Sequence, residues 1–102
     1  MPLYDLNDIK AAAENKRIEY SGRKVQRDIG NLDYVLEDVL DCLMKLDEKD
    51  FNKSGSYEDG NPGYDSYVTK YYKDGRANAD IIFIKFRLID RNVIIDLMSF
   101  HL

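Results

Sequence analysis

The stretch 81-IIFIKFRLIDRNVIIDLMSF-100 decides the fold of this chain. Two runs rich in β-branched and aromatic residues flank the polar Asp90-Arg91-Asn92, a pattern that predicts strand, turn and strand. Because side chains alternate across a strand, the first run has two unlike faces. The apolar face consists of Ile82, Ile84, Phe86 and Leu88. The cationic and aromatic face consists of Phe83, Lys85 and Arg87. We expect the apolar face to pack on helices and the other face to hold the functional side chains.

The register of this hairpin decides on which face His101 lies. A two-residue turn pairs Lys85 with Asp96 and leaves His101 on the face away from Lys85. A bulge near residues 98–100, or a three-residue turn through Asn92, brings His101 to the face of Lys85. The sequence is compatible with each of these registers.

Length and composition predict one cytoplasmic domain spanning residues 1–102. The chain has 102 residues, of which 44% are hydrophobic, and this suits a single core. The lone cysteine, Cys42, excludes an internal disulfide, and its place in a helical pattern indicates a small core residue. No stretch resembles a signal peptide or a membrane span.

The charge of the chain is unevenly distributed. The formal net charge is −4 at pH 7, which taken alone argues against nucleic-acid binding. Carboxylates are concentrated in residues 32–50, whereas lysines and arginines outnumber aspartates in residues 64–91. A local positive patch can therefore exist on this acidic protein.

Apolar residues at helical spacing predict two helices, over residues 3–16 and 32–46. Either Asp5 or Asn7 can cap the first. The second carries its carboxylates on the face opposite to its apolar stripe. Asp47 is a plausible cap for a further helical turn.

The remaining segments complete an α+β domain. They predict an edge strand, a strand or short helix, a polar loop and a further strand, over residues 17–20, 23–29, 52–63 and 64–73. The basic residues of 23–29 form either a solvated face or a phosphate-contacting arm. We expect helices packed on one face of a small, mainly antiparallel sheet that ends in a C-terminal hairpin.

Common metal and nucleotide motifs are missing from the sequence. It contains no CxxC pair, HExxH, Walker loop or GxGxxG. Its single histidine, His101, cannot build a site from several imidazoles. We therefore expect neither a metal nor a cofactor. His101 is either an exposed spectator or a general acid or base, because imidazole titrates near neutral pH.

Five segments of the chain resemble the MqsR family of bacterial toxins and occur in the same order. The stretch LDEKDFNKS (residues 46–54) is similar to that family's L-x-x-x-DF-x-KS segment, and LDYVLEDVLDCL occupies the place of the helix before it. YDSYVTKYY, IIFIKFRL and MSFHL look like the family's DxY segment, Y-I-K strand and terminal SF[K/H] strand. The resemblance covers roughly residues 25–102.

The resemblance implies a RelE-like fold and the toxin of a type II toxin–antitoxin system, acting as a metal-independent mRNA interferase. In such endoribonucleases the ribose 2′-OH attacks the adjacent phosphate, which requires a base, an acid and cations. Lys53 matches the family's loop lysine, and Lys85 matches the strand lysine. His101 stands where members have lysine or histidine, and it would be the acid or the base.

The resemblance also implies RNA contacts and partners. Arg87 would assist at the phosphate, and Tyr67, Tyr71 or Phe83 would stack on an unpaired base. Phe83 stands where the family often has tyrosine and lacks its hydroxyl. The implied partners are a cognate, DNA-binding antitoxin and mRNA, free or on the ribosome.

Other functions compete with this one. The protein could be a non-enzymatic, acidic immunity or inhibitor protein that binds a basic toxin through the helix of residues 32–46. A gyrase-poisoning toxin on the same fold is a third alternative. In the simplest interpretation, Lys53, Lys85 and Arg87 are merely solvated, with Lys85 paired to Asp96 across the strands.

Overall fold

The computed structural model describes residues 1–56 and 62–102. Within them the chain forms, in order, α1 (Leu6–Glu14), β1 (Ile18–Tyr20), α2 (Arg23–Asn31), α3 (Leu36–Met44), a 3-10 turn η1 (Glu48–Asp50), β2 (Phe51–Gly55), β3 (Tyr64–Tyr71), β4 (Asp80–Ile89) and β5 (Ile94–His101). The strands make one sheet in the spatial order β1-β5-β4-β3-β2. β1 runs parallel to β5, and the other neighbours are antiparallel.

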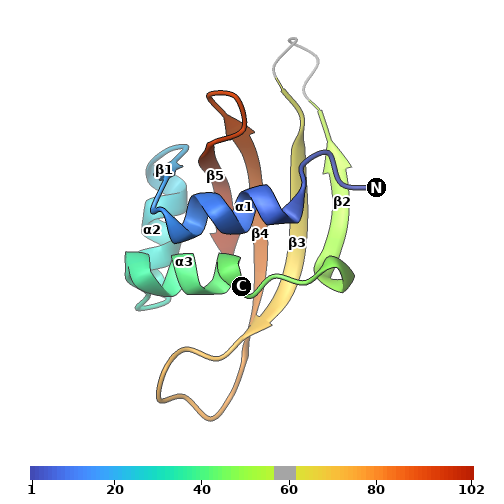
Figure 1. Cartoon of the computed structure of the whole chain (residues 1–102). Helices are drawn as coiled ribbons and strands as arrows, with labels where there is room; N and C mark the ends of the chain where they lie inside the picture. The colour runs from blue at the N-terminus through green and yellow to red at the C-terminus, as the bar shows by residue number, and fades with distance from the viewer. Residues whose placement is uncertain (57–61) are drawn as a thin grey trace.

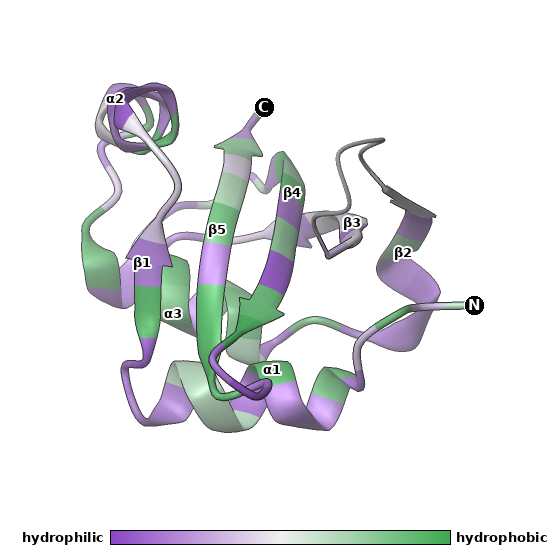
Figure 2. Cartoon of the chain, turned by 90° about the horizontal axis from the view of Figure 1, so that it is seen from above, coloured by the Kyte–Doolittle hydropathy of each residue, from purple (hydrophilic) through white to green (hydrophobic). Residues whose placement is uncertain are grey.

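Helices α1 and α3 lie across one face of this sheet (Figure 1). The alternate apolar side chains of β4, those of Ile82, Ile84, Phe86 and Leu88, point to that face, and each is at most 3% exposed. Full burial of one such aliphatic side chain stabilises the fold by about 1.5–3 kcal/mol. Bands of opposite hydropathy alternate along β4 and β5 (Figure 2). The predicted α+β class, with helices on one face of a mainly antiparallel sheet, is confirmed and agrees with a small RelE-like fold.

The helices begin later than their apolar spacing predicts. α1 begins at Leu6, where the side chain of Asp5 accepts from the backbone N–H of Asn7 and so caps the helix. α3 begins at Leu36 because Val35 is extended and its N–H donates to Asp38. The predicted cap at Asp47 on the following turn is confirmed.

The ambiguous basic segment forms helix α2. Its apolar residues Val25 and Ile29 are 3% and 4% exposed, and the helix packs beside β5 and β1. Arg23, Lys24 and Arg27 are exposed. The segment therefore anchors the β1 edge of the sheet with its apolar side and leaves its basic side to solvent.

The predicted polar loop over residues 52–63 is wrong in its first part. Residues 51–55 form strand β2, which pairs with β3 at the edge of the sheet. The strand is polar because only part of it faces the core, where the ring of Phe51 packs on Tyr67 with centroids 5.6 Å apart. Residues 57–61 of that loop lie outside the described residues.

Candidate functional site

An extra residue in β5 determines the face on which His101 lies. Ile89 pairs with Ile94 across a four-residue loop, so the two-residue turn is wrong. The pairing then shifts between Phe86, opposite Leu97, and Lys85, opposite Ser99. Met98 is thus the additional residue of a bulge, and beyond it the strand faces are exchanged.

His101 therefore lies opposite Phe83 on the sheet face away from α1 and α3, which we call the open face. Without the bulge, His101 would turn toward the core and Phe100 toward solvent. With it, Phe100 is fully buried. The packing of Phe100 in the core and the outward position of His101 therefore depend on the same irregularity.

A cross-strand row places the two lysines of interest on this open face. Lys53 pairs with Ser66, Ser66 with Lys85, and Lys85 with Ser99. Directly paired residues project from the same side of a sheet. Since neighbouring strands are about 4.8 Å apart, the Lys53 and Lys85 backbones are roughly 10 Å apart. Their long side chains can reach a common ligand. Lys53 belongs to β2 and not to a loop.

The imidazole of His101 has a defined orientation. It stacks on the ring of Phe83 with centroids 5.3 Å apart and an interplanar angle of 27°. Its Nδ1 lies 2.9 Å from the Leu102 main-chain oxygen. That oxygen can only accept, so Nδ1 of the neutral ring donates and Nε2 is left to exchange a proton.

The ammonium group of Lys85 lies over an aromatic ring, 4.9 Å from the centroid of Tyr64. Tyr64 was not among the site residues expected from the sequence. The alternation of β3 places it on the open face with Ser66, and this signal depends on knowing that the strand begins at Tyr64. Neither Lys53 nor Lys85 forms an ion pair with any residue of 1–56 or 62–102.

Arg87 is committed to a partner within the protein. Its Nε lies 2.8 Å from a carboxylate oxygen of Asp96, and the two side chains are 22% and 6% exposed. The expected pairing of Lys85 with Asp96 is therefore wrong. Because this ion pair compensates the charge of Arg87, Arg87 is less suited to bind a phosphate than Lys53 or Lys85.

The whole chain, residues 1–102, matches the family described as Motility quorum-sensing regulator, toxin of MqsA. The chain belongs to the MqsR toxin family. It is therefore the toxin of a toxin–antitoxin system, a class that has an antitoxin partner. No curated protein matches the chain. Among the described residues, no helix is both long and apolar enough to cross a membrane.

Two tyrosines proposed to stack on RNA lie in the core of this MqsR-family toxin. Tyr67 and Tyr71 are 1% and 4% exposed. Burial raises the pKa of Tyr67 to about 12 and, together with a hydrogen bond to Asp41, raises that of Tyr71. Their expected RNA contacts are therefore wrong, because β3 turns both rings toward the helices. Of the three proposed rings, only that of Phe83 lies on the open face.

The acidic residues of α3 in this toxin are largely used by its own fold. Asp38 binds the N–H of Val35 and lies 3.6 Å from Nζ of Lys73. Asp41 accepts from the hydroxyl of Tyr71 at 2.7 Å and pairs with Lys45 at 3.0 Å. These contacts engage two carboxylates of the helix, whereas Glu37 stays exposed, so only part of the surface required by the immunity-protein alternative is taken up by the fold.

Proposed function

We propose that this MqsR-family toxin is a metal-independent endoribonuclease that cuts mRNA by attack of a ribose 2′-OH on the adjacent phosphate. The observation that carries the proposal is the presence of Lys53, Lys85 and His101 on one open face of the sheet. They come from three separate strands, so only the folded chain assembles them. The family's toxin character supports the same conclusion.

Each residue has a role that follows from its chemistry. The free Nε2 of His101 exchanges a proton, either as the base for the 2′-OH or as the acid for the leaving 5′-oxygen. Lys53 and Lys85 stabilise the negative charge that develops on the phosphorane. Phe83 orients the imidazole by stacking and presents its remaining surface to a base.

The direct experiment incubates the purified toxin with a defined single-stranded RNA in EDTA. We expect cleavage that leaves a cyclic phosphate. His101→Ala should slow it by about 10²–10⁴-fold, the usual contribution of a general acid or base. Lys53→Ala and Lys85→Ala should each slow it by about 10²-fold through lost charge stabilisation.

Lys10→Ala is the matched control, because Lys10 lies on α1 at the opposite face of the sheet. It should cleave at the wild-type rate. Failure of the unaltered toxin to cut any RNA would refute the activity. Wild-type rates in all three site variants would instead refute the site while leaving the activity in place.

Within a cell, this activity must be restrained by the antitoxin. We expect growth arrest when the toxin is expressed alone and recovery when a cognate antitoxin is co-expressed. We propose a DNA-binding antitoxin as that partner. Growth arrest should be lost in the His101→Ala variant if RNA cleavage causes it.

A further inference from the structure

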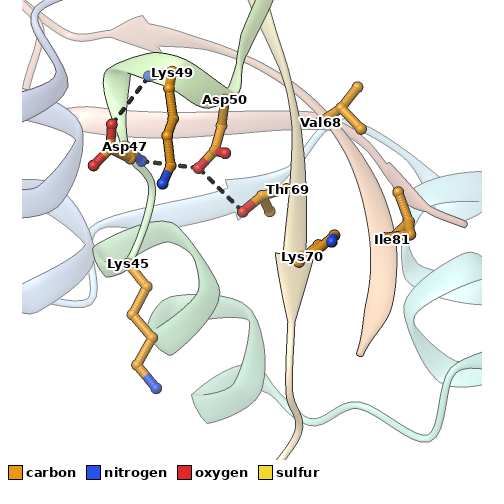
Figure 3. A pocket seen from close by; sticks show the side chains of 8 residues that line it. All are labelled: Lys45, Asp47, Lys49, Asp50, Val68, Thr69, Lys70 and Ile81. Atoms are coloured by element: carbon orange, nitrogen blue, oxygen red, sulfur yellow. Dashed lines mark hydrogen bonds between the residues drawn. The ribbon is translucent and has the colours of Figure 1, made fainter. Parts of the chain in front are cut away.

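On the side of β2, residues 68–71 of β3 pair with no strand of the described chain. Pairing with β2 ends where Phe51 meets Tyr67, whereas β3 continues to Tyr71. Beside this edge lies a hollow of about 590 Å³, lined in part by Lys45, Lys49 and Lys70. Thr69 points toward Asp50, while Val68, Lys70 and Ile81 point to the other side of β3 (Figure 3). The hollow therefore runs from the turn η1 around the edge to the open face.

Lys45 of this hollow is paired with Asp41, but its other two lysines are more available than its carboxylates. Asp47 accepts from the N–H of Lys49 at 3.0 Å, and Asp50 accepts from Asp47 N–H and Thr69 Oγ1. Lys49 and Lys70 form no ion pair with any described residue. The carboxylates thus serve the local fold, and these two ammonium groups remain to bind an anion.

Two exposed apolar residues, Val68 and Ile81, lie between the hollow and the candidate site, and we call them the apolar step. Val68 pairs with Phe83, and Ile81 pairs with Lys70, so all four project from the open face. Val68 is 41% and Ile81 48% exposed, so both present apolar surface to a ligand. Ile81 and Lys85 are four positions apart along β4, which corresponds to about 13 Å.

We propose that this step and hollow form a second RNA contact, which holds a single-stranded segment flanking the bond that is cut. A flanking base lies on Val68 and Ile81, and Lys70 and Lys49 bind a phosphate beyond it. An exposed apolar surface, followed by cations that form no ion pair with a described residue, matches the alternation of base and phosphate in an unpaired strand. The inference rests on the nuclease function proposed above and extends its substrate to a stretch longer than the two nucleotides at the cut.

The binding test uses a 2′-O-methyl octauridylate, which lacks the attacking hydroxyl and stays intact. For single strands, each phosphate contact contributes about 0.7 to the slope of log affinity against log salt. The double variant Lys49→Ala/Lys70→Ala should therefore lower that slope by about 1.4 and weaken binding on the order of tenfold at 0.1 M salt. The control Lys10→Ala/Lys16→Asn removes the same charge from the α1 side. It should change neither the salt slope nor the affinity.

A cleavage test separates this contact from the cut site. The double variant should raise KM for an RNA octanucleotide and leave kcat unchanged, whereas its cleavage of a dinucleotide should equal that of the wild type. Equal behaviour of the double variant and its control would overturn the inference, as would an equal loss on both substrates. Loss of antitoxin binding with RNA binding intact would also overturn it, since the hollow would then be a protein interface. Failure of the wild-type toxin to cut any RNA would instead refute the proposed function, and the octauridylate measurement distinguishes that result.

Discussion

Single side chains in this toxin have roles set by the face on which they project. Met98 adds one residue to β5, and this turns Phe100 into the core and His101 onto the open face. Phe83, which lacks a hydroxyl for proton transfer, instead supports the imidazole by stacking. Cys42 lies on the buried side of α3 and is 1% exposed, as its place in the apolar spacing predicts.

The thiol of Cys42 should be inert in the folded protein. Burial, with a smaller contribution from Asp41, raises the pKa of Cys42 to about 12. At pH 8 only about one molecule in ten thousand then carries a thiolate. We expect alkylation by iodoacetamide, followed by mass spectrometry, to be at least 10³-fold slower in native than in urea-unfolded protein. Comparable rates in the two states would contradict the burial of this side chain.

Secondary-structure elements are joined here by polar contacts at the margin of the core. The hydroxyl of Tyr71 on β3 donates to Asp41 on α3, and that of Tyr34 donates to Asp80 at 2.6 Å. Each buried ring thereby satisfies its hydroxyl at the core boundary. The acidic face of α3 therefore fastens the helix to the sheet, although its pattern alone suggests simple solvation or a docking surface.

The contact between α3 and β3 predicts a pH dependence. Burial acts to raise the pKa of Asp41, but hydrogen bonds from Tyr71 and Lys45 outweigh it, so the pKa lies below its ordinary value. A carboxyl group whose pKa is lower in the folded state stabilises the protein above its unfolded pKa. This stabilisation is lost as pH falls through the folded pKa. Asp41→Asn should cost about 0.5–1 kcal/mol at pH 6, where the partly exposed pair is screened by solvent.

This cost should shrink below about pH 4, where the wild-type carboxyl is itself protonated. Urea unfolding at several pH values measures the free energy of unfolding of the wild type and of the Asp41→Asn variant. Asp74→Asn, at an exposed carboxylate that forms no ion pair with a described residue, provides the control. A cost that is independent of pH would show that lost packing, and not the charge of Asp41, stabilises this contact.

On the scale of the whole molecule, the start of the chain is tied to the strands that carry the site. Asp65 of β3 is completely buried and accepts from the N–H groups of Leu3 and Tyr4, each at 2.9 Å. It also accepts from the hydroxyl of Ser54 on β2. One carboxylate thus joins the N-terminal segment, β2 and β3, and β2 carries Lys53.

Substitution of Asp65 should loosen β2. Asp65→Asn replaces a charged acceptor by an amide whose NH₂ group would face a donor, and should cost about 2–4 kcal/mol. Hydrogen exchange of residues 51–55 should accelerate more than that of β4 and β5, and RNA cleavage should fall with it. Asp74→Asn, a substitution at an exposed position, should change neither the hydrogen exchange of residues 51–55 nor the rate of RNA cleavage. Uniform acceleration over the whole sheet would show that Asp65 stabilises the fold globally and is no local clamp.

Several features of this toxin follow directly from its sequence. The strict alternation in β4 determines its buried and open faces, because a strand reverses its side chains at every residue. Helical spacing likewise determines α1, α3 and the burial of Cys42. The short motifs around Lys53, Lys85 and His101 indicate the MqsR family, to which the whole chain belongs.

Other features were decided only by tertiary structure. The position of His101 on the open face depends on the Met98 bulge. The same bulge allows Phe100 to be buried in the core. Strand β2 forms from polar residues because an edge strand needs only its backbone partner and one anchored ring. Tyr67 and Tyr71 point inward, and Arg87 is neutralised by Asp96, because pairing across strands sets these neighbours. The spacing of residues along the sequence determines which of them share a face of one strand. Long-range packing selects the register in which separate strands pair.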